Sequence, residues 1–200
     1  SRKLASALEK DGVKKGDVVA TLALNTYRHL EMYYGISGMG AITHTLNFRL
    51  HPEQAVYIIN HAEDKIIFVE LPFVPILEAL QENLKTVEKY VVLCEVDEMP
   101  ETTLNNAISY EEYIQDGDEN YSWPTLEDDA ACALCYTSGT TGNPKGVLYS
   151  HKSNVIHAQA ALTAMTIKPD DTILMVVPLF HVLAWGIPYF GPMNGLKLVM

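Results

Sequence analysis

The stretch "YTSGTTGNPKGVLYSHKSN", Tyr136 to Asn154, combines residue types that can bind an anion. Gly139, Gly142 and Gly146 permit backbone conformations closed to other residues, so amide N–H groups can converge on one ligand. Hydroxyl groups beside them donate hydrogen bonds, and Lys145 adds a positive charge. Because the stretch contains no carboxylate, it suits the oxygens of a phosphate. The predicted phosphate-binding positions are Thr137, Ser138, Gly139, Thr140, Thr141, Gly142 and Lys145.

Two common nucleotide-binding motifs do not fit this loop. The Walker loop requires Gly-x-x-x-x-Gly-Lys-[Ser/Thr]. Counted from Gly139, the position that needs glycine holds Pro144, and Lys145 is followed by Gly146. The dinucleotide fingerprint Gly-x-Gly-x-x-Gly fails here as well. The loop is therefore a phosphate site of another kind.

The segment "LCYTSGTTGNPKG" resembles the phosphate-binding signature of the adenylate-forming family, which includes acyl-CoA synthetases, luciferases and peptide-synthetase adenylation domains. The match runs from Leu134 to Lys145 without a mismatch. "LNFRLHPEQAVYIINHAEDKIIFV" and "VVPLFHVLAWGIPY" are similar to neighbouring segments of the fatty-acyl-CoA synthetases in that family. The whole chain resembles the early-to-middle part of the large N-terminal domain of a medium- or long-chain fatty-acid–CoA ligase. Leu183 departs from the pattern, since many such enzymes carry Asn at this position.

The resemblance implies ATP-dependent activation of a fatty acid to an acyl-adenylate and then to acyl-CoA, with ATP and Mg²⁺ as cofactors and CoA as second substrate. It makes the loop residues ligands of the β- and γ-phosphates. It further implies catalytic roles for Lys145 and His181, substrate contacts for His181, Trp185 and Gly186, and a metal contact for Thr137.

Two other functions stay open. One is a different adenylate-forming enzyme, such as a fatty-acid:AMP ligase or an aryl-acid–CoA ligase. The other is a non-catalytic nucleotide-binding module. For the single residues, a hydrogen-bonded core histidine at His181 and simple core packing at Trp185 stay open as well.

The elements that must position these residues alternate between strand and helix. Apolar, β-branched runs predict strands, and apolar residues at helical spacing predict helices. Such alternation predicts an α/β fold with a doubly wound, mostly parallel sheet and flanking helices. The predicted strands are 16–24, 41–47, 65–70, 89–96, 131–138, 146–149 and 172–178, and the predicted helices are 1–12, 26–41, 51–63, 74–87 and 150–165.

The linker "WPTLEDDA", beginning at Trp123, predicts a boundary between two subdomains. Residues 1–122 would form a first α/β subdomain with an acidic excursion near 95–122. Residues 123–200 would begin a second, which carries the phosphate loop. Twelve carboxylates and no Lys or Arg lie between Glu95 and Asp129, and such a run is typical of a solvated surface.

Charge and cysteine content restrict the class of protein. A net charge of -11 argues against a nucleic-acid-binding surface. Three cysteines without a signal peptide favour a reducing, cytoplasmic compartment. Cys132 and Cys135 form a lone Cys-x-x-Cys that lacks the further ligands of a zinc site, so we interpret them as strand residues.

The apolar run from Ile173 to Met193 has the length of a membrane span but contains three prolines and His181. We expect a strand followed by a buried irregular segment, and no transmembrane helix. Peripheral membrane contact and a homodimer stay open. The chain begins inside a helix and stops in a strand-like run, which suggests part of a longer protein.

Overall fold

The computed structural model describes residues 1–137, 143–165 and 167–200. Its main layer is a seven-stranded sheet with the order β5-β4-β3-β1-β2-β6-β7. The strands are β1 (Val18–Leu22), β2 (Ile42–Thr45), β3 (Ile66–Val69), β4 (Lys89–Val92), β5 (Ala107–Ser109), β6 (Ala131–Thr137) and β7 (Lys145–Ser150). Strands β1 to β6 pair in parallel, and only the β6–β7 pair within this sheet is antiparallel. The predicted fold class is therefore confirmed.

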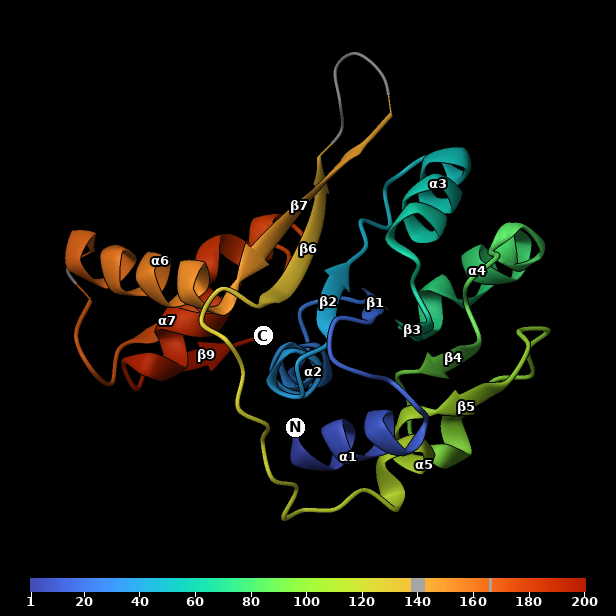
Figure 1. Cartoon of the computed structure of the whole chain (residues 1–200), viewed down its shortest axis with the longest axis horizontal. Coiled ribbons are helices and arrows are strands. Elements are labelled where there is room, and N and C mark those ends of the chain that lie inside the picture. The colour runs from blue at the N-terminus through green and yellow to red at the C-terminus, as the bar shows by residue number, and fades with distance from the viewer. Residues whose placement is uncertain (138–142, 166) are drawn as a thin grey trace.

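Helices cover both faces of the sheet (Figure 1). They are α1 (Arg2–Lys10), α2 (Tyr27–Gly38), α3 (Pro52–Ala62), α4 (Val74–Leu80), α5 (Tyr110–Gln115), α6 (His151–Ala164) and α7 (Ile187–Met193), with short 3₁₀ turns at Leu71–Phe73, Gln81–Asn83, Val96–Glu98 and Val182–Gly186. Helices α1, α2 and α5 pack on one face, and α3 and α4 pack on the other.

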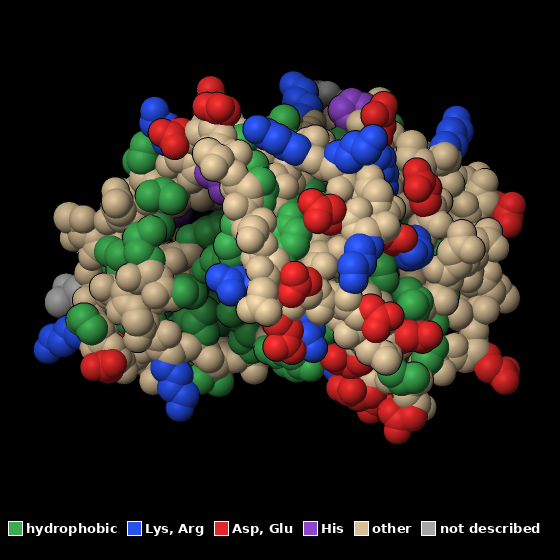
Figure 2. All heavy atoms as spheres, turned by 60° about the horizontal axis from the view of Figure 1, so that its bottom comes forward, with side chains coloured by type: hydrophobic (Ala, Val, Ile, Leu, Met, Phe, Trp, Pro, Cys, Tyr) green, Lys and Arg blue, Asp and Glu red, His purple; other side chains and the backbone are tan. Residues whose placement is uncertain are grey.

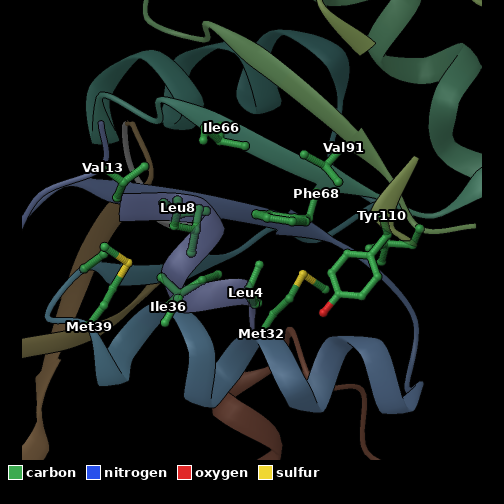
Figure 3. Close-up of a cluster of buried hydrophobic side chains, with 14 of the residues drawn as sticks. Leu4, Leu8, Val13, Met32, Ile36, Met39, Ile66, Phe68, Val91 and Tyr110 are labelled. Carbon is green, nitrogen blue, oxygen red and sulfur yellow. The ribbon is translucent and has the colours of Figure 1, made fainter. Parts of the chain in front are cut away.

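Successive side chains of the central strands point to opposite faces of the sheet, so each face has its own hydrophobic core. On β3, Phe68 points into the cluster with α1 and α2, whereas its neighbour Ile67 belongs to the cluster with α3 and α4. Figure 3 shows Leu4 and Leu8 of α1 facing α2 across this first core. Strands covered on both faces are near-continuous apolar runs, which is why the sequence pattern identified them.

The predicted starts of α3 and α6 are confirmed to within one residue. Pro52 occupies the first turn of α3. Backbone N–H groups in the first turn have no partner within the helix, so proline costs no hydrogen bond there. Ser150 caps α6, because its Oγ accepts a hydrogen bond from Ser153 N at 3.1 Å. Helix α6 thereby begins directly at the end of β7.

The C-terminal part differs from the sequence prediction. A second sheet pairs β8 (Thr172–Leu174) with β9 (Lys197–Val199) in parallel. The predicted strand 172–178 therefore ends at Leu174, and the segment predicted to be irregular contains α7. Pro188 lies in the first turn of α7, which is a position that favours helix initiation rather than preventing it. In the described part of the chain, no helix is both long and apolar enough to span a membrane.

The main sheet continues across the predicted subdomain boundary. Strand β6 pairs with β2 through Thr43↔Ala133 and His44↔Leu134. The division between residues 122 and 123 stays a prediction. Of the twelve carboxylates in the acidic run, all except the half-buried Glu111 are exposed. Figure 2 shows acidic side chains distributed over one face of the molecule, with a denser group at the bottom of the view.

Candidate functional site

A cavity of about 360 Å³ lies at the carboxyl ends of β2 and β6. Thr45 is the last residue of β2 and Thr137 the last of β6, and ligands of open α/β sheets bind at this edge. The cavity is lined by Thr45, Asn47, Leu50, Ile58, Cys135, Tyr136, Thr137, Pro144, Val147, Tyr149, Phe180, His181 and Val182. Two sequence-predicted site residues, Thr137 and His181, thus lie in one cavity although they are far apart in the sequence.

Strands β6 and β7 pair antiparallel and form the stem of the phosphate loop. Thr137 pairs with Lys145, and Tyr136 pairs with Gly146. A Cβ at position 146 would lie 3.1 Å from Leu134 Cδ1 and 3.2 Å from Tyr136 Cζ. A side chain at position 146 would require Leu134 or Tyr136 to shift by a few tenths of an ångström.

Part of the predicted phosphate site can be placed. Thr137 and Lys145 face each other across the stem, and both are exposed. Lys145 itself is not among the lining residues, but its neighbour Pro144 is. Ser138, Gly139, Thr140, Thr141 and Gly142 lie outside the described residues. Their assignment to phosphate stays a prediction.

Asn25 holds the segment that leads to His181. Its Nδ2 donates to Met175 O at 2.8 Å and to Val177 O at 3.0 Å. Its Oδ1 accepts from Leu179 N at 2.8 Å. Since these bonds engage the backbone directly after β8, they fix an irregular path to the cavity. The sequence prediction missed Asn25; its place directly after a buried strand was the available signal.

Trp185 and Gly186 lie beside the cavity rather than among its lining residues. Trp185 is 59% exposed, and Gly186 is buried with a φ of 81°. Both belong to a left-handed turn that begins at Val182, one residue after His181. Their predicted contact with substrate therefore stays a prediction.

Aromatic and ionisable groups support the cavity from the α3 face of the sheet. Tyr136 Oη lies 2.6 Å from His61 Nδ1, and its ring centroid lies 5.1 Å from that of His44. His44 Nδ1 bonds to Asp64 at 2.8 Å, and both side chains are fully buried. Burial raises the pKa of Asp64, and it raises the pKa of Tyr136 to about 12. Tyr136 therefore stays neutral beside the loop at ordinary pH.

The described lining combines polar groups with apolar residues such as Leu50, Val147 and Phe180. It offers hydroxyl, amide and imidazole groups at Thr45, Asn47, Thr137 and His181 and contains no carboxylate, although the chain is strongly acidic. Mg²⁺ usually binds a few protein oxygens together with substrate phosphates. Thr137 offers one such oxygen, and the described residues hold no cluster of three or more metal-binding side chains. Cys132 and Cys135 are buried strand residues with raised thiol pKa values, caused by burial.

The sequence profile of the family described as AMP-binding enzyme matches residues 1–200. The chain belongs to this AMP-binding enzyme family.

Two curated relatives match the whole chain. One is a medium-chain-fatty-acid–CoA ligase of Ectopseudomonas oleovorans, 48% identical over 202 residues. The other is a 3-methylmercaptopropionyl-CoA ligase of Ruegeria pomeroyi, 47% identical over 202 residues. The chain spans 37% and 38% of their lengths, so it corresponds to little more than a third of each AMP-binding enzyme.

The fold is shared with a solved structure. The N-terminal domain of FACL13 from Mycobacterium tuberculosis superposes with a TM-score of 0.85 at 26% identity. That match covers 98% of this chain and 47% of the other.

Proposed function

We propose that this chain is the N-terminal portion of an acid–thiol ligase that converts a fatty acid, ATP and CoA to acyl-CoA, AMP and pyrophosphate. The observation that carries the proposal is the cavity at the ends of β2 and β6, in which Thr137 and His181 meet beside the Lys145 stem. The relatives named as CoA ligases support the reaction class, since they match the full length of the chain.

The first step needs a leaving group to be stabilised. A carboxylate oxygen of the acid attacks the α-phosphorus of ATP, the bond to the β-phosphate oxygen breaks, and pyrophosphate leaves with the electron pair. Donors aimed at the departing phosphates stabilise the charge that builds there. We assign this role to Lys145 and to the loop positions Thr137, Ser138, Gly139, Thr140, Thr141 and Gly142.

Mg²⁺, when bound, would neutralise phosphate charge, and Thr137 Oγ1 is the chain's candidate oxygen ligand. His181 projects from the segment fixed by Asn25 and lines the cavity, so we assign it to the acid carboxylate and α-phosphate. Trp185 and Gly186, on the turn beside it, are assigned to the acyl chain.

In the second step the CoA thiolate attacks the carbonyl carbon of the acyl-adenylate, and AMP leaves with the electrons of the carbon–oxygen bond. The isolated chain is proposed to bind the phosphates without completing either step, because it spans about a third of each relative. The subdomain division at residues 122 and 123, cytoplasmic location, peripheral membrane contact and a homodimer stay predictions.

A panel of acids tests the proposal and separates the alternatives. The complete protein that contains this chain is assayed for AMP formation with C6 to C18 fatty acids, 3-methylmercaptopropionate and aryl acids, each with and without CoA. Fatty-acid- and CoA-dependent AMP formation supports the proposal. Acyl-adenylate that accumulates regardless of CoA indicates a fatty-acid:AMP ligase. A preference for aryl acids indicates an aryl-acid–CoA ligase. ATP binding without turnover indicates a non-catalytic nucleotide-binding module.

A further inference from the structure

Residues 182–186 form a turn of left-handed backbone. The φ angles are 48° at Val182, 52° at Leu183, 46° at Ala184, 56° at Trp185 and 81° at Gly186. Residues with a Cβ enter this region at an energetic cost and usually singly. A β-branched residue such as Val182 tolerates it least. Consecutive residues of this kind persist only when surrounding contacts hold them.

Buried side chains hold the turn from inside. Leu183 and Ala184 belong to a core cluster with Cys135 of β6 and Leu179, and both are almost fully inaccessible. Ala184 N also donates to His181 O at 2.9 Å. The turn is therefore connected directly to the residue that lines the cavity.

His157 of α6 holds the turn from outside. Its Nε2 donates a hydrogen bond to Trp185 O at 3.1 Å. The imidazole also lies against Gly186, because a Cβ at that position would be 2.6 Å from His157 Cδ2. Gly186 thus meets two requirements, a positive φ and room for the ring.

We propose that His157 is a positioning residue that keeps residues 182–186 in the left-handed conformation and thereby places His181 and Trp185 for the acid substrate. It acts through the backbone of the turn and needs no contact with substrate. The effect on turnover rests on the proposed function, whereas the effect on the turn does not.

The test uses the complete protein with His157→Ala, His157→Gln, Val182→Gly and the double variant His157→Ala/Val182→Gly. Glycine at 182 lowers the cost of the left-handed conformation, so it should offset the loss of the imidazole. Hydrogen exchange of the backbone amides of residues 182–186 reports on the turn, and the KM values for acid and for ATP report on the site. Gln159→Ala, an exposed change on α6, is the matched control.

We expect His157→Ala to speed amide exchange in the turn and to raise the KM for the acid roughly 2- to 10-fold, as for the loss of one hydrogen bond, with the KM for ATP within about twofold of wild type. His157→Gln, which keeps a donor, should lie close to wild type. The double variant should return toward the Val182→Gly single variant in both measurements.

Unchanged amide exchange in His157→Ala overturns the proposal, as does a double variant no better than His157→Ala alone. A wild-type protein without acid-dependent activity would count against the proposed function instead. In that case the exchange measurements on the same variants still decide the role of His157.

Discussion

Tyr136 and His61 lie 2.6 Å apart, from phenol oxygen to Nδ1. This contact joins α3, which contains His61, to the end of β6. Tyr136 is the second-last residue of that strand, and the phosphate loop follows it. The tyrosine ring also packs at a tilt against His44, which is paired with the buried Asp64. The base of the loop is thus held by side chains from elements that precede it by tens of residues.

A double-mutant cycle measures the contact between Tyr136 and His61. Tyr136→Phe keeps the ring and removes the hydroxyl, and His61→Ala removes its partner. We expect a coupling of about 0.5–1.5 kcal/mol in the free energy of urea unfolding, the usual net value of one hydrogen bond. Strictly additive single changes would show that the contact contributes nothing.

Lys145→Ala should weaken ATP binding. The side chain is exposed and stands at the mouth of the loop stem. Loss of a charge-assisted hydrogen bond of about 1.5–3 kcal/mol corresponds to an increase of roughly 10- to 150-fold in Kd. Titration calorimetry with ATP measures it, with the exposed Lys168→Ala as the matched control. Equal affinities in both variants would remove Lys145 from the phosphate site.

Asn25→Ala should lower kcat more than it changes ATP affinity. The substitution leaves Met175 O, Val177 O and Leu179 N without their side-chain partner, so the path to His181 loosens. A loss of about 1–3 kcal/mol in unfolding free energy should accompany the change. Asn120→Ala, at an exposed position, serves as control. A normal kcat in Asn25→Ala would show that the segment holds its shape without this amide.

His29 should make stability depend on pH. Burial lowers its pKa to about 4, from an ordinary value of 6.5, and its two ring nitrogens bond to Thr21 Oγ1 and Leu24 O. Because the folded-state pKa lies below the unfolded one, the neutral ring stabilises the fold above pH 6.5. About 3 kcal/mol of this stabilisation is lost as the pH falls toward 4. Urea unfolding at pH 7, 5.5 and 4.5 should show this slope in wild type, and His29→Gln should reduce it.

The sequence predicted the elements whose pattern is long and locally encoded. Strands β1, β3 and β4 are largely apolar and buried, α3 begins with Pro52 in its first turn, and α6 begins at the Ser150 cap. The phosphate loop and His181 were found because their residue types carry the chemistry. Their presence in one cavity depends on tertiary contacts, because His181 follows β8 of the second sheet and the bonds of Asn25 fix the path of that segment.

The remaining features depend on tertiary contacts. Strand β5 has three residues inside an acidic run, and only its pairing with β4 gives it a strand conformation. Helix α7 is seven residues long and contains two prolines, so local propensity argues against it. The left-handed turn is held by His157, and the segment before His181 is held by Asn25. Both contacts join residues distant in sequence, and no local pattern encodes such pairs.

AMP formation by the complete protein tests whether this chain is part of a fatty-acid–CoA ligase. Wild-type protein and its Lys145→Ala and His181→Ala variants are supplied with ATP, Mg²⁺, CoA and a C6 to C18 fatty acid, and AMP is measured against time. We expect wild type to form AMP only when both acid and CoA are present, and each variant to be at least about tenfold slower. Wild type that forms no AMP with any of these acids, or variants as fast as wild type, would contradict this expectation.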